Sequence, residues 1–306
     1  MSQDTIVVTA ANIHPDAVAL LSDYRVVYAD VRAGETALAE LCGQEQPIAI
    51  MVRYGNISEK VISASSKLKV IAKHGVGTDN IDKVAAARLS IPVTAALGSN
   101  SQAVAEQTLA LMFACARQIA WLDTRMRQGH WDKDNYAGIE LAGATLGLIG
   151  AGSIGRRVAQ VALALGMKVV VHDPYAIPGS LPTGVHLVDL EPLLAQANVI
   201  SLHCPLTPET RNLLDADRLA KLQDQTIIVN TARAGLFDEA ALLAELHARR
   251  LHAGIDCFQE EPLGNSSPWL VAPNTILTPH IGGTTTTAFR QMGVMAAESI
   301  LSHLNC

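Results

Sequence analysis

A glycine-rich turn between two apolar runs constrains the fold of this chain more than any other feature. The run 145–149 leads into Gly150-x-Gly152-x-x-Gly155, and after a helical pattern a second apolar run ends at Asp173. This order of strand, turn, helix and strand is the βαβ unit that binds dinucleotides. In that unit the helix N-terminus presents N–H groups to the phosphates. The residues expected in this phosphate turn are Gly150, Gly152, Ser153, Ile154 and Gly155.

The acidic residue at the end of the second run indicates which dinucleotide binds. A carboxylate at Asp173 would accept hydrogen bonds from the ribose hydroxyls and would repel a 2′-phosphate. The following residues, 174–178, include no Arg or Lys that could neutralise such a phosphate. NAD is therefore expected in preference to NADP. The alternative for this carboxylate is a turn cap, because Asp followed by Pro is a common turn pair.

Composition and charge restrict the class of protein. Of 306 residues 49% are apolar and only 17% are charged, which suits parallel sheets that are covered on both faces. The net charge of −6 and the lack of a basic cluster argue against nucleic acid or an anionic membrane as a partner. No run is long enough to span a membrane, no secretory signal is visible, and the five cysteines are scattered. We therefore expect a cytoplasmic protein with reduced thiols and no metal site.

Apolar runs alternate with helical patterns on both sides of the glycine turn. Such alternation predicts an α/β protein with two doubly wound parallel-sheet domains. A long helix over about 101–128 is expected to join the halves. The predicted domains are 1–100 with 284–306, for the substrate, and 101–283, for the dinucleotide. Besides 145–149, strands are expected at 6–9, 26–28, 48–52, 70–72, 93–95, 169–172, 199–203, 227–230, 253–256 and 276–277.

Three successive strand ends in the second half bring a guanidinium, a carboxylate and an imidazole to one edge of the predicted sheet. They belong to Arg233, Glu261 and His280. Arg233 can hold a carboxylate or a carbonyl oxygen with two donors, and His280 can transfer one proton near neutral pH. Glu261 can hold one nitrogen of that imidazole and favour its protonated form. With a hydride donor, this set suits the reduction of a 2-oxo acid. Taken singly, each residue could be a surface ion pair, a cap or a loop residue.

Seven segments spread over nearly the whole chain form one pattern. They are HGVGTDNID at 74–82, AVAE at 103–106, the glycine turn at 147–155, LHCPLT at 202–207, NTARAG at 230–235, DCFQEEP at 256–262 and TPHIGG at 278–283. Together they resemble the D-2-hydroxyacid dehydrogenase family, which includes the 3-phosphoglycerate dehydrogenases. The resemblance implies a flavodoxin-like substrate domain and a Rossmann domain that binds NAD. Two small departures are Ala234, where many members have Gly, and Cys257, where many have Val.

The resemblance also implies roles for individual residues. Arg233, Glu261 and His280 match the catalytic triad of the family. The implied cofactor contacts outside the phosphate turn are Asp173, His203, Cys204, Pro205, Thr231, Asp256 and Gly282, and Asp256 matches the residue that holds the nicotinamide carboxamide. The implied substrate contacts are Arg53, His74, Gly75, Val76 and Gly77. A homodimer through the long helix and the arm 129–145 is also implied.

The residues around 53–77 bear on the substrate. A Gly-Val-Gly turn at a strand end exposes consecutive N–H groups, which form a nest for an anion. Arg53 could bind a distal acidic group of the substrate or simply solvate a strand end, and the sequence leaves both open. The phosphoglycerate dehydrogenases usually have Ser-x-Thr after this arginine, whereas this chain has Tyr54-Gly55-Asn56. That difference argues against 3-phosphoglycerate and leaves hydroxypyruvate, glyoxylate or a sulfonated analogue as candidates.

Two other functions fit the same fold. The C-terminal-binding-protein corepressors resemble dehydrogenases but use NADH to control assembly, so they would show little turnover. Formate dehydrogenase is disfavoured because that branch has Gln where this chain has Glu261. The expected activity is therefore the NAD-dependent interconversion of a small D-2-hydroxy acid and its 2-oxo acid.

Overall fold

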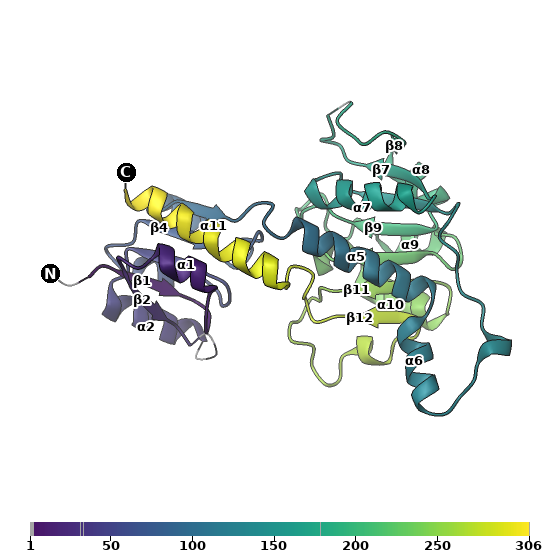
Figure 1. Cartoon of the computed structure of the whole chain (residues 1–306), viewed down its shortest axis with the longest axis horizontal. Coiled ribbons are helices and arrows are strands. Elements are labelled where there is room, and N and C mark those ends of the chain that lie inside the picture. The colour runs from purple at the N-terminus through teal and green to yellow at the C-terminus, as the bar shows by residue number, and fades with distance from the viewer. Residues whose placement is uncertain (1–2, 31, 33, 178, 306) are drawn as a thin grey trace. The chain divides into compact units, whose positions relative to one another are not determined.

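The structure is a computed structural model that describes residues 3–30, 32, 34–177 and 179–305. The chain divides into two compact units (Figure 1). The first unit comprises Met1–Asn100 and Gly283–Cys306, and the second comprises Ser101–Gly282. Gly283 belongs to the first unit, one residue away from the boundary expected from the sequence. Within the described ranges, no helix has the length and apolar character needed to cross a membrane.

The first unit is built on a five-stranded parallel sheet with the order β2-β1-β3-β4-β5. This is the flavodoxin-like order that the family resemblance implies. The strands are β1 (Thr5–Val8), β2 (Arg25–Tyr28), β3 (Ala49–Val52), β4 (Val70–Lys73) and β5 (Val93–Ala95). Successive residues of a strand point to opposite faces, so Val7 faces one layer of helices whereas Ile6 and Val8 face the other. The first layer contains α2 (Gly34–Glu45), α3 (Glu59–Ser63) and α4 (Lys83–Arg88), and the second contains α1 (Pro15–Leu20) and α11 (Thr286–Leu304).

The last helix of the chain completes the first unit. α11 packs on α1 and on β4, although its sequence follows the whole second unit. Ala296, Ala297 and Ile300 are buried in the core that they share with β1 and β3. Thr285 caps the helix, because its hydroxyl oxygen accepts a hydrogen bond from the Ala288 N–H. The segment 284–306, expected to belong to the substrate domain, therefore packs within the first unit.

The second unit is built on a seven-stranded parallel sheet with the order β12-β11-β10-β9-β6-β7-β8. The chain builds the sheet outward from β6 in one direction and then from β9 in the other, which is the Rossmann arrangement with one added strand. The strands are β6 (Thr145–Ile149), β7 (Lys168–His172), β8 (Val185–Leu187), β9 (Val199–Leu202), β10 (Ile227–Asn230), β11 (His252–Ile255) and β12 (Thr275–Leu277). The strand order reverses between β6 and β9, and ligands of such sheets bind at this point, beyond the carboxyl ends of the strands.

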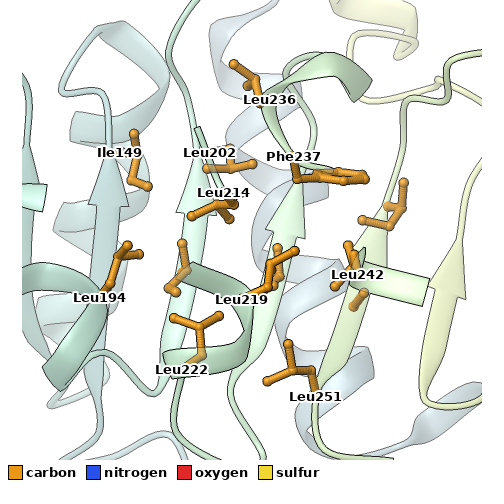
Figure 2. Packing of buried hydrophobic residues seen from close by; sticks show 14 of the residues in the cluster. Ile149, Leu194, Leu202, Leu214, Leu219, Leu222, Leu236, Phe237, Leu242 and Leu251 are labelled. Atoms are coloured by element: carbon orange, nitrogen blue, oxygen red, sulfur yellow. The ribbon is translucent and has the colours of Figure 1, made fainter. Parts of the chain in front are cut away.

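Apolar residues from strands and helices interlock on one face of this sheet (Figure 2). Ile149 and Leu202 come from β6 and β9, whereas Leu194 and Leu242 come from helices that cover them. These helices are α8 (Leu190–Gln196), α9 (Ala216–Lys221) and α10 (Glu239–His247). The opposite face carries α5 (Ser101–Ala116) and α7 (Ser153–Ala164). Because β9 and β10 are buried on both faces, the edge of the sheet that carries their C-terminal ends is rigidly supported.

The prediction of a single long helix over 101–128 is wrong. The structure has two helices there, α5 and α6 (Ile119–Arg127), and Gln118 between them is left-handed with φ of +49°. The carbonyl oxygen of Ala116 accepts a hydrogen bond from the Ile139 N–H at 2.8 Å, which ends the α5 ladder. The helical periodicity continues through the break, so a pattern of apolar residues could not reveal it. The short elements β8 and α9 were also not predicted.

Candidate active site

The glycine turn lies where the strand order of the second sheet reverses. It follows β6, and His203 follows the neighbouring strand β9. Gly150 has φ of +102°, and a Cβ on it would lie 2.7 Å from the carbonyl carbon of His203. A Cβ on Gly155 would overlap the carbonyl oxygen of Gly150. Gly152 differs, because a Cβ there would meet nothing within 4 Å. The space in front of the first turn of α7 is therefore open to a ligand.

Asp173 is held against this turn by two backbone donors. Its Oδ2 accepts a hydrogen bond from the Ala151 N–H at 2.8 Å, and its Oδ1 accepts one from the Tyr175 N–H at 2.9 Å. The second bond is the turn-capping contact that the sequence left open as an alternative. The first bond joins the carboxylate to the glycine turn. Since each carboxylate oxygen can accept more than one hydrogen bond, both remain able to accept from ribose hydroxyls.

The loop after β9 presents groups that are uncharged at neutral pH. The Nε2 of His203 lies 2.9 Å from the Ser201 hydroxyl, and burial lowers the pKa of His203 to about 4. Burial also raises the pKa of the Cys204 thiol to about 11. Pro205 is exposed, and its carbonyl oxygen accepts a hydrogen bond from the Thr210 hydroxyl at 2.7 Å. Residues 203–205 therefore add no charge beside the phosphate turn.

Three further residues expected at the cofactor have partners in α5 or in the core. The Ser153 hydroxyl lies 2.8 Å from that of Ser101, and the Thr231 hydroxyl lies 2.9 Å from that of Thr108. Ile154 packs against the buried cluster between α5 and the sheet. These contacts fix the start of α7 and the end of β10 to the same helix. A dinucleotide bound along this edge would meet a preorganised backbone.

Glu261 and His280 form a hydrogen-bonded pair, as their chemistry led us to expect. The Nδ1 of His280 lies 2.8 and 3.0 Å from the two carboxylate oxygens of Glu261. Glu261 is fixed in turn, because its Oε1 accepts a hydrogen bond from the Phe258 N–H at 2.9 Å. His280 has φ of +52°, a left-handed conformation that is uncommon for a residue with a side chain. With Nδ1 facing the carboxylate, Nε2 is the nitrogen left for a reacting group.

Asp256 holds the turn that carries His280. Its carboxylate is 1% exposed and accepts three hydrogen bonds, from the Thr278 hydroxyl, the Ile281 N–H and the Gly282 N–H, at 2.6 to 2.9 Å. A Cβ on Gly282 would lie 2.9 Å from Oδ2 of this carboxylate, so glycine permits the approach. The sequence suggested a contact of Asp256 with the nicotinamide carboxamide and missed this role. A carboxylate at the end of a buried strand, just before a His-containing turn, is the signal that could have revealed it.

Arg233 is half-buried and starts the short helix η3 (Ala234–Leu236) after β10. The side chain of Asn230 accepts a hydrogen bond from the Ala232 N–H at 2.9 Å and donates one to the Arg233 carbonyl oxygen at 2.8 Å. This turn fixes the backbone that presents the guanidinium. Because β10, β11 and β12 are neighbours in the sheet, Arg233 and His280 follow strands that end at the same edge.

The Gly-Val-Gly turn of the first unit follows β4. Gly75 has φ of +145°, and its carbonyl oxygen accepts a hydrogen bond from the Ala96 N–H at 2.9 Å. Within the part of the chain that the structure describes, no acceptor receives the N–H of Gly75, Val76 or Gly77. Three successive donors without acceptors have the character of an anion nest.

His74 and Arg53, also expected at the substrate, differ in their surroundings. His74 is 3% exposed, and its ring lies 5.2 Å from the ring of Phe289, centroid to centroid. Burial, and to a smaller extent the charge of Arg53, lower the pKa of His74 to about 4, so the imidazole is neutral. Both of its ring nitrogens are buried, which places this side chain in the interior and not on a surface open to substrate. Arg53 is half-buried and makes no ion pair with any described residue.

Comparison with known proteins identifies the family. Residues 109–282 match the model of the D-isomer specific 2-hydroxyacid dehydrogenase NAD-binding domain. The chain belongs to the D-2-hydroxyacid dehydrogenase family. It is 42% identical to hydroxypyruvate reductase from Thermotoga maritima over 251 residues, which cover 81% of each protein. It is 38% identical to D-3-phosphoglycerate dehydrogenase from Mycobacterium tuberculosis over 299 residues, which cover 96% of this chain and 56% of the relative.

Structural comparison agrees with this family. The crystal structure of a glyoxylate reductase from Paecilomyes thermophila superposes with a TM-score of 0.87 at 31% identity, covering 98% of this chain and 95% of the other. The dehydrogenase spans only about half the length of the phosphoglycerate dehydrogenases that it matches. It is an NAD-dependent oxidoreductase that acts on D-2-hydroxy acids and 2-oxo acids, and the corepressor alternative is not favoured.

Cofactor preference should depend on Asp173. We expect kcat/KM with NADH to exceed that with NADPH strongly, because the carboxylate meets the 2′ position. Asp173→Ala should lower the ratio of the two kcat/KM values. The main cause should be weaker binding of NADH, since the hydrogen bonds to the ribose are lost. Glu191, an exposed carboxylate on α8, supplies a control in Glu191→Ala that should leave the ratio unchanged. Equal kcat/KM for the two cofactors in the native dehydrogenase would contradict this assignment.

Asp256→Asn should disturb the His280 turn although it is nearly isosteric. All three partners of the carboxylate are donors, so the amide nitrogen of Asn would face a donor in either orientation. A buried donor without an acceptor costs about 1–3 kcal/mol of unfolding free energy. We expect a stability loss of this size in urea unfolding, together with a fall in kcat. Native kcat in a destabilised variant would show that Asp256 supports the fold but not the position of His280.

Proposed function

We propose that the dehydrogenase reduces a short 2-oxo acid that carries a second polar or anionic group. Hydroxypyruvate and a sulfonated analogue carry such a group. The 2-oxo partner of 3-phosphoglycerate also carries one, although residues 54–56 argue against it. Glyoxylate is a candidate as the shortest 2-oxo acid and has no such group. The observation that carries the proposal is the Glu261–His280 pair, fixed at the sheet edge that also carries the glycine turn. Relatives named hydroxypyruvate reductase, D-3-phosphoglycerate dehydrogenase and glyoxylate reductase support the substrate class.

In the proposed reaction NADH, held by the phosphate turn and Asp173, supplies the hydride. The residues of the chain supply the proton and hold the substrate. His280 carries the proton on Nε2 and gives it to the oxygen that forms on C2, while Glu261 stabilises the charged imidazole through Nδ1. Arg233 orients the 2-oxo acid and stabilises the charge that develops on that oxygen. In the oxidative direction the neutral imidazole of His280 accepts the proton.

We assign the substrate carboxylate to the three successive N–H groups of residues 75–77 in the first unit. Their lack of acceptors among the described residues supports this role. The neutral state of His74 also supports it, because the nest then depends on backbone dipoles and on no titrating group. His74 itself would support the loop from the interior and would not touch the substrate.

A panel of 2-oxo acids with NADH, followed by absorbance, tests the proposal. We expect appreciable kcat/KM on at least one of the short polar acids and less on long apolar acids. Binding of NADH without turnover on any acid would contradict the proposal and favour an NADH-sensing protein.

Arg53 is proposed to bind the distal group of the substrate. It makes no ion pair with a described residue, so its charge remains for a ligand. Arg53→Ala should raise KM about ten- to a hundredfold for a phosphorylated 2-oxo acid, since a hydrogen bond to a charged group is lost. Glyoxylate has no distal group, so its KM should not change. Equal losses on both substrates would mean that Arg53 has only a structural role.

We further propose a homodimer that forms through α6 and the arm 129–145. No residue of α6 is buried, and Ile119, Trp121 and Met126 are about half exposed. Trp131 in the arm is 74% exposed. Large apolar side chains that are exposed together mark a protein interface. Sedimentation equilibrium measures whether the protein is a dimer.

We also propose a location in the cytoplasm. The free thiols that are buried or half-buried support it, and they are Cys42, Cys115, Cys204 and Cys257.

A further inference from the structure

The guanidinium of Arg53 is bracketed by two aromatic rings in the first unit. Its Cζ lies 4.6 Å from the centroid of the Phe289 ring and 5.1 Å from that of Tyr54. Tyr54 is the next residue along the chain, whereas Phe289 comes from the first turn of α11. A cation over the face of an aromatic ring within about 6 Å is attracted by the ring quadrupole. Both rings attract the guanidinium, and Phe289 supplies the nearer ring from a distant part of the chain.

One nitrogen of this guanidinium is buried without a hydrogen-bond partner among the described residues, so the two rings are important for holding it. This nitrogen is the Nη1 of Arg53. The neighbouring imidazole of His74 is neutral and packs on the same Phe289 ring. The face of an aromatic ring is a weak acceptor for an N–H group. The Phe289 ring, the nearer of the two rings, thus takes part in holding the guanidinium of Arg53 in the interior.

Three other charged residues of the first unit, Arg290, Asp16 and Lys73, do not replace this contact. Arg290 is next to Phe289, and its Nε donates to Asp16 Oδ2 at 2.5 Å. Asp16 is therefore already paired with a cation. The Nζ of Lys73 donates to the Arg53 carbonyl oxygen at 3.1 Å and to Asn80 at 2.9 Å, so Lys73 fixes the backbone of Arg53 and not its side chain. Thr9 also holds that backbone, since its Oγ1 accepts the Arg53 N–H at 3.1 Å.

We propose that Phe289 is a positioning residue for substrate selection, because it fixes the Arg53 guanidinium that receives the distal anionic group. This inference rests on the proposed function of Arg53. The backbone of Arg53 is fixed by Thr9 and Lys73, and the guanidinium is fixed by the ring. Loss of the ring would leave the Arg53 side chain free to rotate beyond its fixed backbone. An anionic substrate would then have to order this side chain on binding, which weakens the binding.

Phe289→Leu removes the ring face and keeps an apolar side chain at this position. We expect KM for a phosphorylated 2-oxo acid to rise about three- to tenfold, the range of a cation–π contact at a partly buried site. KM for glyoxylate and the Kd for NADH should not change. Phe289→Tyr keeps the ring face and should restore the native KM within about twofold. Met295→Leu, an exposed position on the same helix, is the matched control and should have no effect.

The double variant separates this inference from the proposed function. In Arg53→Ala, adding Phe289→Leu should cause no further rise in KM for the phosphorylated acid, because the ring has no guanidinium to hold. Substrate discrimination lost in Arg53→Ala but kept in Phe289→Leu would overturn the role of Phe289 and leave that of Arg53 intact. Equal changes in KM for both acids in Arg53→Ala would overturn both. Equal rises in KM for both acids in Phe289→Leu would show a structural role only.

Discussion

His280→Ala should reduce kcat for 2-oxo acid reduction by about 10²–10⁴-fold, the range for loss of a general acid. In the proposed reaction the Nε2 of His280 gives the proton, because Nδ1 is bonded to Glu261. The Kd for NADH should stay near its native value, since the phosphate turn and Asp173 lie at other strand ends. Steady-state kinetics measures kcat, and fluorescence titration measures the Kd for NADH.

The control for this prediction is another histidine of the second unit. His247 ends α10 and is exposed, so His247→Ala should change neither kcat nor the Kd for NADH. His280 also has φ of +52°, and alanine there would be strained. His280→Asn, which tolerates that conformation better, should lose kcat to the same degree. Near-native kcat in both His280 variants would contradict the assignment of the proton donor.

The sequence predicted that three candidate catalytic residues follow strands that end at one edge of the sheet, because the relevant information is local. Arg233, Glu261 and His280 each follow an apolar strand, and parallel strands of one sheet end at one edge. Chemistry alone then led to the expectation that Glu261 pairs with the imidazole, and the structure confirms the hydrogen bond. The strand order of both sheets also agrees with the predicted fold class.

Features that depend on distant contacts could not be predicted in this way. Phe289 reaches Arg53 across more than two hundred residues, and no local pattern encodes that contact. The three donors of Asp256 come from a turn that the sequence shows only as a motif. The break at Gln118 interrupts a periodicity that continues on both sides of it, so the contact of Ala116 with Ile139 decides it. In each case tertiary packing overrides or completes a local signal.

Gly155→Ala and Gly152→Ala should separate the needs of the fold from those of the cofactor. A Cβ at residue 155 would overlap the Gly150 carbonyl oxygen, so helix and strand must move apart. Overpacking of this kind costs about 1–3 kcal/mol, and we expect both the unfolding free energy and the NADH affinity to fall.

At residue 152 the same added methyl group should act only on the ligand. Gly152 has φ of −68°, an ordinary value for alanine, and nothing lies within 4 Å of the added Cβ. The unfolding free energy without cofactor should therefore stay native. The methyl group would occupy the space into which the pyrophosphate must come, so the Kd for NADH should rise about ten- to a hundredfold, equivalent to about 1.4–2.8 kcal/mol. Calorimetric titration measures the Kd and urea unfolding measures the stability. A native Kd in Gly152→Ala would place the phosphates elsewhere, whereas a parallel loss of stability would mean that the turn is more crowded than its geometry indicates.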